Sequence, residues 1–424
     1  MMISSSKNVA SNKMKFIWNM LGTTSTAAVS ILLLMIVSRF LTKIEADIFS
    51  FAYAVGNQLI TIALFQVRNL QSTDINQKYK FKDYLYTRII TCIAMLAISG
   101  GYIYFTDYDI YKDVIIWIIC LYRCLDALSD VFQGFFQQKE RLDFAGKSLF
   151  YRNSFVLITF TLTLIFSKNL ILSLILICLV SIFSLFLFDV KPLHYFKIDS
   201  SLKSNKNIKI LKLLQDSFPL FINGFLLIFI YNQSKFSLDK LLELGKLEPG
   251  IQTQFNILFM PIFVINLIFL FLRSYITTMA VHFVKKEIAQ FNRIEKTLFK
   301  YLTGISIIVL FLSYLIGIPV LSAVYRVDLS QYKTVFIMLI FGGILSTFAT
   351  MIDNFLTVMR YQKFLIIPYF LAFIVSFFTS DWLAGKYDVW GVTISFNIAM
   401  AVWLILSLII YKILKHRMET ENVV

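Results

Sequence analysis

The chain has 424 residues, of which 58% are hydrophobic and 15% are charged, and its mean hydropathy is +0.74. This composition is too apolar and too poor in charge for a water-soluble globular protein. The formal net charge of +15 is compatible with a nucleic-acid partner only if the basic residues gather on one soluble surface. The chain is therefore expected to fold in a lipid bilayer.

The apolar residues fall into twelve long runs. A helix rises about 1.5 Å per residue and the hydrocarbon core is about 30 Å thick, so a span needs about 20 mainly apolar residues. In chain order the expected spans are Phe16–Phe40, Ile48–Gln66, Leu85–Phe105, Asp113–Gln133, Leu149–Phe166, Leu170–Phe188, Leu213–Tyr231, Ile251–Leu272, Leu302–Tyr325, Thr334–Leu356, Phe364–Phe378 and Trp390–Tyr411. The first run is too long for a signal peptide and lacks a persuasive cleavage site.

Lysine and arginine crowd into every other connection between these spans, and the N-terminal segment belongs to the basic set. One group in this set is Lys139, Arg141, Lys147 and Arg152. The other connections hold few basic residues, which are Lys43, Lys112, Lys168, Lys235, Lys240, Lys246, Arg326, Lys333 and Lys386. The positive-inside rule then predicts that both termini are cytoplasmic. The net charge reflects topology, with attraction to anionic membrane lipids as a second effect, and no nucleic-acid partner is expected.

The fourth span carries the most informative polar pattern. Its members recur at spacings of three and four and are Arg123, Asp126, Asp130, Gln133 and Gln137. At about 100° per residue they share one helix face. A charge at mid-bilayer costs about 2.5–3.5 kcal/mol on insertion scales, so this face should meet protein or water. Two interpretations stay open: one wall of a hydrophilic cavity, or a structural pair of Arg123 with Asp126.

The polar segment Asp189–Lys212 separates six spans from six. The sequence thus predicts an all-α integral membrane protein whose two six-helix bundles surround a central hydrophilic cavity. The bundles are residues 1–188 and residues 213–424, the second ending in a short cytoplasmic tail, and residues 189–212 form a cytoplasmic linker. Two halves of equal span count are typical of transporters that rock between two faces of the membrane.

Four prolines lie within spans of the second half and none within those of the first. They are Pro219, Pro261, Pro319 and Pro368. Each removes a backbone donor and favours a kink. Static kinks and a bending seventh helix around Pro219 are both compatible with this pattern.

Further charged residues lie at or near the ends of spans. Arg39, Lys235 and Lys240 are either anchors that extend to the membrane interface or ligands for an anion. Asp216 and Asp353 are ion-coupling carboxylates, partners in a cytoplasmic gate, or simply solvated groups.

Soluble chemistry has little support. The three histidines lie far apart, which predicts no metal site, and no phosphate-binding loop is present. The four cysteines fall within spans, where a thiol usually acts as a small apolar filler. No enzyme activity and no cofactor are expected, so energy for transport would come from a proton or sodium gradient or from consumption of the product.

Three stretches resemble the Wzx-type polysaccharide flippases of the multidrug/oligosaccharidyl-lipid/polysaccharide exporter superfamily, and the likeness extends over nearly the whole chain. The first is Val67-Arg68-Asn69-Leu70-Gln71-Ser72-Thr73-Asp74 with Tyr84 and Arg88, the second is Asp130-Val131-Phe132-Gln133-Gly134 with Gln137, Arg141 and Asp143, and the third is Pro219-Leu220-Phe221-Ile222-Asn223 with the stretch from Gly250 to Pro261.

The resemblance implies that the protein moves an undecaprenyl-diphosphate-linked oligosaccharide to the outer leaflet of the bacterial cytoplasmic (inner) membrane. Its product would supply a surface polysaccharide, either the O-antigen of lipopolysaccharide, a capsule or an exopolysaccharide. A polysaccharide polymerase and a chain-length regulator would be partners.

On this interpretation a water-filled groove holds the diphosphate, which arginine can bind in a bidentate manner. The expected substrate-binding residues are Arg39, Arg123, Lys235 and Lys240. Asp126 and Asp130 would orient Arg123. The residues expected to line the cavity or act in gating are Asp126, Asp130, Gln133, Asp216 and Asp353.

Two rival functions remain. A cation-coupled multidrug exporter of the same superfamily would share the fold, but an acidic lumen would suit its organic cations better. A membrane polysaccharide polymerase usually places catalytic residues on a long outer loop, and the longest outer connection here, about Asn232–Gly250, is modest.

Overall fold

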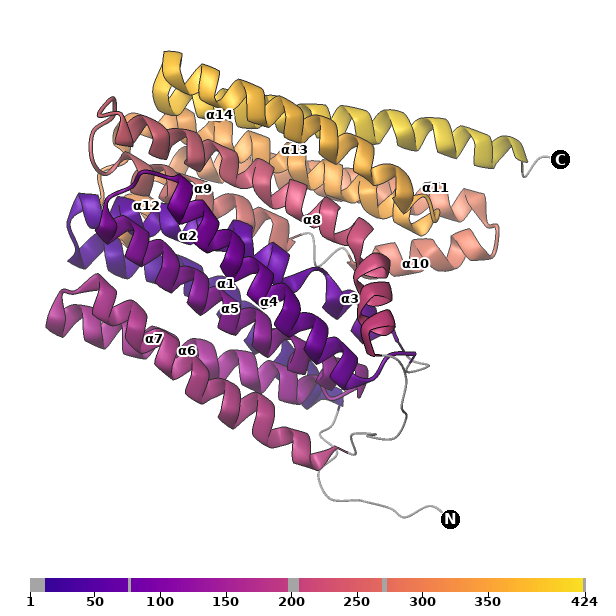
Figure 1. The fold of residues 1–424 in the computed structure, drawn as a ribbon. Helices are drawn as coiled ribbons and strands as arrows, with labels where there is room; N and C mark the ends of the chain where they lie inside the picture. Colours follow the sequence, from indigo (N-terminus) through magenta and orange to yellow (C-terminus); the bar gives the residue numbers. More distant parts are fainter. Residues whose placement is uncertain (1–11, 75–77, 197–205, 269–272, 422–424) are drawn as a thin grey trace. The chain divides into compact units, whose positions relative to one another are not determined.

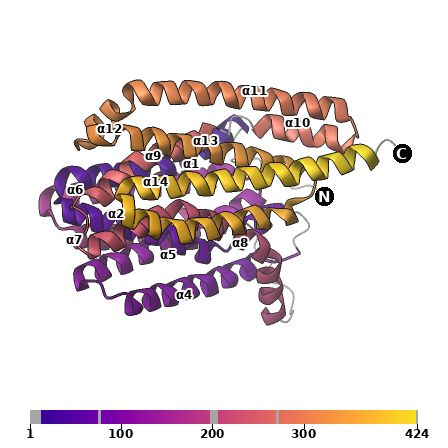
Figure 2. The ribbon, with the colours of Figure 1, turned by 90° about the horizontal axis from the view of Figure 1, so that it is seen from above.

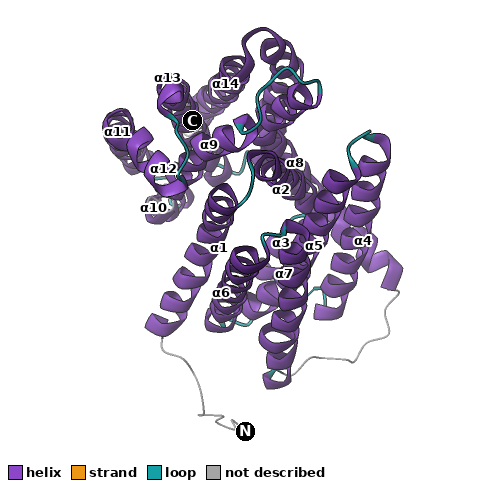
Figure 3. Cartoon of the chain, turned by 90° about the vertical axis from the view of Figure 1, so that its left-hand side faces the viewer, coloured by secondary structure: helices purple, strands orange, loops and turns teal. Residues whose placement is uncertain are grey.

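The computed structural model describes residues 12–74, 78–196, 206–268 and 273–421, and every regular element in these ranges is a helix (Figure 3). The chain divides into two compact units, Met1–Phe221 and Ile222–Val424. We call them the N-terminal and C-terminal units and describe each by itself. The boundary lies within one long helix, α8.

The N-terminal unit is built from seven numbered helices and the start of α8. Their bounds are α1 Asn12–Phe40, α2 Lys43–Leu64, α3 Val67–Thr73, α4 Phe81–Phe105, α5 Ile110–Gln138, α6 Leu142–Ser167 and α7 Leu170–Ser184. A π-helical turn, Leu185–Val190, and a 3-10 helix, Lys191–Tyr195, continue α7. Helix α1 packs along α6, and α2 packs along α5 (Figure 1). The polar face of α5 is therefore covered by protein, as a charged stripe requires.

The contact between α1 and α6 depends on two glycines. A Cβ atom added to Gly22 would lie 2.7 Å from the Gly146 carbonyl oxygen. A Cβ atom added to Gly146 would overlap the carbonyl of Trp18 and lie 2.6 Å from the backbone nitrogen of Asn19. Small residues at such a crossing let two membrane helices approach backbone to backbone.

The C-terminal unit contains the rest of α8 and six further helices. Their bounds are α8 Lys206–Glu243, α9 Ile251–Ile268, α10 Arg273–Val284, α11 Ile288–Leu312, α12 Ile318–Tyr325, α13 Lys333–Val358 and α14 Ile366–Glu421. A π-helical turn joins α11 to α12, and α14 consists of two helices that meet at Asp388 (φ 48°). Helices α10 and α11 lie side by side (Figure 2).

The described helices account for all twelve predicted spans. Nine are long and apolar enough to cross a membrane, and they include Gln362–Arg417, which holds the last two predicted spans. Two predicted spans are not among the nine: α5, which carries the charged stripe, and α9, which ends at Ile268 beside residues outside the described ranges. An all-helical, multi-pass membrane protein is thus confirmed. The central cavity stays a prediction.

Two connections differ from expectation. The connection expected over Asn232–Gly250 is helical as far as Glu243, so Lys235 and Lys240 lie on α8. Arg152, grouped above with the basic residues of a connection, is a buried residue of α6. The linker expected at 189–212 falls partly on residues 197–205, which lie outside the described ranges, and its boundaries stay a prediction.

Candidate functional site

Two arginines share one carboxylate on the polar face of α5. Arg123 Nη1 lies 3.0 Å from Asp126 Oδ2, and Arg152 Nη2 of α6 lies 3.2 Å from Asp126 Oδ1. Arg123 Nη2 donates to Asn57 Oδ1 at 2.7 Å. The Arg123 guanidinium also stands 4.3 Å from the centroid of the Tyr53 ring. We call these five residues the Asp126 cluster.

The Asp126 cluster holds three buried nitrogen donors and one buried acceptor, Asp126 Oδ1, that have no hydrogen-bond partner among the described residues. The exposed fractions are 12% for the Arg123 side chain, 13% for Asp126 and 6% for Arg152. The three donors are Nε and Nη1 of Arg152 and Nε of Arg123, which find no hydrogen-bond acceptor in the part of the chain that the structure describes. Because buried polar groups are nearly always hydrogen-bonded, these atoms need an explanation. Asp126 is thus a partner of Arg123, as expected, but it also serves Arg152.

The next carboxylate along α5, Asp130, also meets two arginines. Its Oδ1 lies 2.8 Å from Arg68 Nη1, and its Oδ2 lies 2.7 Å from Arg88 Nη2. Arg68 donates in addition to Gln133 Oε1 (3.0 Å) and to Gln137 Oε1 (3.3 Å). The expectation that Asp130 orients Arg123 is therefore wrong. Asp130 instead neutralises Arg88, which is fully buried, and ties α3 and α4 to α5.

Asp189 is a third buried carboxylate in this unit. Its oxygens accept hydrogen bonds from Ser129 at 2.6 Å and from Ser148 at 2.5 Å. Gln133 extends this network by donating to the Ser129 hydroxyl. Sequence reasoning placed Asp189 at the start of a solvated linker, but the π-helical turn after α7 keeps it inside the bundle.

Asp216 fastens the first part of α8 to the N-terminal unit. Its carboxylate accepts from the Tyr79 hydroxyl at 2.9 Å and from Lys78 Nζ at 3.3 Å. The hydrogen bonds to Tyr79 and to Asp216 raise the pKa of Lys78. The Asp216 side chain is partly exposed, so it is neither fully solvated nor buried.

In the C-terminal unit Lys235 is buried without a carboxylate in ion-pair contact among the described residues. Its ammonium donates to Asn232 Oδ1 at 3.3 Å and lies 4.9 Å from the centroid of the Phe259 ring. Lys240, further along the same helix, is exposed and pairs with Asp381 at 2.9 Å. An anchor at the membrane interface would leave its ammonium in water. Lys235 does not fit that interpretation.

Asp353 is buried at the centre of a hydrogen-bond network. It accepts from Tyr369 (2.8 Å), Trp403 Nε1 (3.1 Å) and Ser407 (2.8 Å). These donors are neutral, so the carboxylate is satisfied without a cation. The interpretation of Asp353 as a merely solvated group near a helix end is wrong.

Arg39 lies half-buried in the last turn of α1, where its charge complements the helix dipole. Arg39 and Arg123 belong to the N-terminal unit, whereas Lys235 and Lys240 belong to the C-terminal unit. A common substrate site formed by all four stays a prediction.

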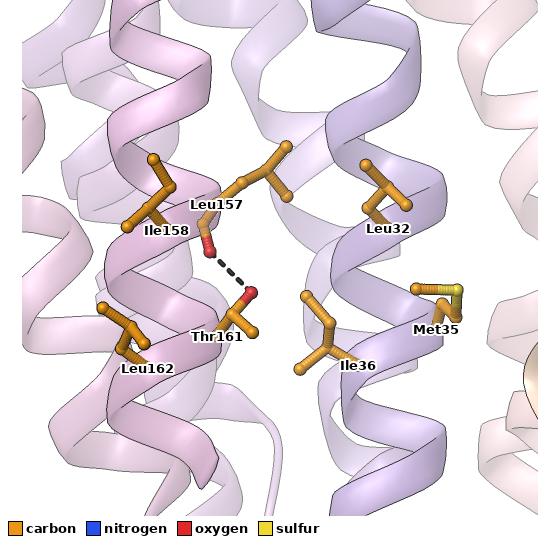
Figure 4. A pocket seen from close by; sticks show the side chains of 7 residues that line it. All are labelled: Leu32, Met35, Ile36, Leu157, Ile158, Thr161 and Leu162. Atoms are coloured by element: carbon orange, nitrogen blue, oxygen red, sulfur yellow. Dashed lines mark hydrogen bonds between the residues drawn. The ribbon is translucent and has the colours of Figure 1, made fainter. Parts of the chain in front are cut away.

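An apolar groove of about 360 Å³ runs between α1 and α6 (Figure 4). Its lining is Leu32, Met35, Ile36, Leu157, Ile158, Thr161 and Leu162. The Thr161 hydroxyl donates its proton to the Leu157 carbonyl at 2.7 Å, so it has no donor left for a ligand.

No family model and no curated protein matches the chain. Solved structures do resemble it in fold. An inward-facing multidrug resistance MATE family transporter of the MOP superfamily matches with a TM-score of 0.59 and 10% identity, over 97% of each chain. An outward-facing one matches with a TM-score of 0.58 and 13% identity, over 94% of this chain and 95% of the other.

A further match is a MOP superfamily transporter from Pyrococcus furiosus, described by a binding pocket of reverse polarity that suggests a different function. Its TM-score is 0.54 and its identity 12%, over 94% of this chain and 95% of the other. The chain therefore has the twelve-helix, two-bundle fold of MATE transporters, and this architecture is the one that the sequence predicts. At these identities the likeness concerns the fold alone.

Proposed function

We propose that the protein moves a large amphipathic substrate across a membrane by alternating access. The fold supports this proposal, because solved structures that share it include one outward-facing and one inward-facing transporter. The two compact units of the chain are the bodies that would rock against each other. On this proposal both termini are cytoplasmic, and the membrane is the bacterial inner membrane.

The substrate that the buried charges favour is anionic, and we identify it as an undecaprenyl-diphosphate-linked oligosaccharide. The observation that carries this assignment is a pair of buried cations: Arg152, whose Nε and Nη1 have no hydrogen-bond partner among the described residues, and Lys235, whose ammonium has only the neutral Asn232 amide as its hydrogen-bond acceptor there. Sugars and a diphosphate cannot enter hydrocarbon unless polar groups replace water. A polysaccharide polymerase and a chain-length regulator would act on the translocated product.

The second candidate is a cation-coupled multidrug exporter, and the structural comparisons favour it over the flippase, since they name multidrug transporters. Asp353 is the residue that suits this function. Its buried carboxylate accepts only neutral donors among the described contacts, so it could exchange them for a proton, a sodium ion or an organic cation.

Deletion of the gene separates the two candidates. The flippase predicts loss of surface polysaccharide and accumulation of complete lipid-linked repeat units inside, with unchanged sensitivity to cationic drugs. Normal surface polysaccharide with raised sensitivity to cationic dyes and drugs would instead support the exporter. Single repeat units stranded on the outer face would indicate a polymerase.

Replacing Arg123 by alanine is expected to lower polysaccharide export about ten- to hundredfold, because a charged group loses hydrogen bonds worth about 1.5–3 kcal/mol. Arg123→Lys should retain part of the export, since lysine keeps the charge but not the planar fork. Surface polysaccharide is measured against the amount of protein in the membrane. Normal export by the alanine variant at normal abundance would leave Arg123 only its structural pairing with Asp126.

A further inference from the structure

We propose that Arg152 and Arg123 form a phosphate-binding seat in the N-terminal unit, and that Asp126 is the resident counterion which a phosphate group displaces. This inference rests on the proposed function, since it names the group that would hold the diphosphate of the substrate. Arg152 is the specificity-determining residue of the seat.

A comparison with Arg68 shows why Arg152 is singled out. Nε, Nη1 and Nη2 of Arg68 each donate to Asp130, Gln133 or Gln137. Among the described residues Arg152 makes one ion-pair contact, from Nη2 to Asp126, and Asp126 is shared with Arg123. Arg68 is thus occupied by its own structure, whereas Arg152 has donors to offer.

Asp189, the other carboxylate near Arg152, does not accept from the unpaired donors of Arg152. Asp189 lies within electrostatic reach of Arg152. Both of its oxygens, however, already accept strong hydrogen bonds from Ser129 and Ser148. Asp189 therefore balances charge at a distance and leaves Nε and Nη1 of Arg152 without an acceptor.

The exposure of the seat is uneven. Arg123 and Asp126 are each more exposed than Arg152, so they form its more accessible edge. An anion that arrives at this edge first meets Arg123 and Asp126. If it displaces the carboxylate, it gains Arg152 as well.

A phosphate suits this exchange better than a second carboxylate. Arginine binds phosphate through paired N–H donors, and a phosphate presents more acceptor oxygens than a carboxylate. One phosphate can therefore accept from both guanidinium groups at once. The same chemistry is found on a lipid-linked diphosphate and on the headgroup of an anionic membrane lipid.

The test uses the full-length protein in phosphatidylcholine nanodiscs, with inorganic pyrophosphate as the probe. Pyrophosphate affinity is measured calorimetrically, together with the shift in unfolding temperature that binding produces. We expect Arg152→Gln to weaken pyrophosphate about tenfold or more. Asp126→Asn should strengthen it, because the competing carboxylate is gone. The matched control, Arg68→Gln, should lower the unfolding temperature yet leave pyrophosphate affinity unchanged.

Undiminished pyrophosphate binding by Arg152→Gln, or weaker binding by Asp126→Asn, would overturn the seat. If Arg152→Gln does not fold, Asp126→Asn alone decides, through a larger or smaller stabilisation by pyrophosphate than in the unchanged protein. Adding phosphatidylglycerol to the discs identifies the source of the phosphate. If phosphatidylglycerol weakens pyrophosphate binding to the unchanged protein through Arg152, the seat binds a membrane-lipid headgroup. If phosphatidylglycerol has no effect on pyrophosphate binding, the seat is assigned to the substrate diphosphate.

The seat and the proposed function can fail separately. Arg152-dependent pyrophosphate binding in a protein whose gene is dispensable for surface polysaccharide would keep the seat and refute the flippase. Loss of polysaccharide on gene deletion, with undiminished pyrophosphate binding by Arg152→Gln, would refute the seat and leave the flippase.

Discussion

Asp130→Asn should destabilise the N-terminal unit by about 3–5 kcal/mol, because removing one partner of a buried ion pair leaves an uncompensated charge. Asp130 holds Arg88, which is fully buried, at 2.7 Å and Arg68 at 2.8 Å. The asparagine amide keeps the shape but not the charge. Thermal unfolding of the purified protein in detergent measures the loss of stability. The buried cysteines report unfolding, because their thiols become accessible to a thiol-reactive dye.

Asp381→Asn is the matched control for this result. Asp381 also pairs with a cation, Lys240, but both side chains are largely exposed. An exposed pair is worth about 1 kcal/mol or less. Equal stabilities of Asp130→Asn and Asp381→Asn would show that the ion pairs of Asp130 with Arg68 and Arg88 do not hold α3, α4 and α5 together.

Gly146→Ala should have a comparable effect, because the added methyl group would meet the backbone of α1 and not a movable side chain. Its Cβ would overlap the Trp18 carbonyl and lie 2.6 Å from the Asn19 backbone nitrogen. Overpacking usually costs about 1–3 kcal/mol, and a backbone clash belongs at or above the upper end. We expect most of the variant to be lost from the membrane fraction, measured by quantitative immunoblotting.

Gly101→Ala provides the comparison, since an added Cβ at this position of α4 has nothing within 4 Å. Alanine is favoured over glycine within a helix by about 1 kcal/mol, so this control should be as abundant as the unchanged protein or more so. Normal abundance of Gly146→Ala would mean that α1 and α6 do not pack as closely as the structure has them.

The fold was largely predictable because the length and composition of a span are local properties. Each apolar run corresponds to a described helix, and the solved structures of the same fold confirm two six-helix bundles. The polar face of α5 was predictable for the same reason, since helical period alone brings Arg123, Asp126 and Asp130 to one side.

The partners of that face were not predictable. Arg152 was grouped with a connection because charged and polar residues precede the apolar part of α6, whereas the helix already begins at Leu142. Asn57 and Tyr53 are unremarkable polar positions on α2 until that helix packs against α5. Only tertiary contacts decide that Asp126 forms an ion pair with Arg152 while Asp130 forms one with Arg88.

The same limit explains the misjudged connection after the seventh span. The run from Asn232 to Lys235 is polar and resembles a loop, yet its side chains are buried by neighbouring helices and α8 continues through it. Packing overrides local polarity there. Of the two interpretations left open for Lys235, that burial favours a ligand for an anion over an anchor at the membrane interface.

The most direct test of the flippase is transport of the proposed substrate by the purified protein. Proteoliposomes would carry a labelled undecaprenyl-diphosphate-linked oligosaccharide, and a membrane-impermeant oxidant would report how much label is accessible from outside. The account predicts that the unchanged protein exposes label from the inner leaflet and that Arg123→Ala does not. Label that stays protected with both proteins, while a cationic dye is transported, would contradict the flippase and establish the exporter.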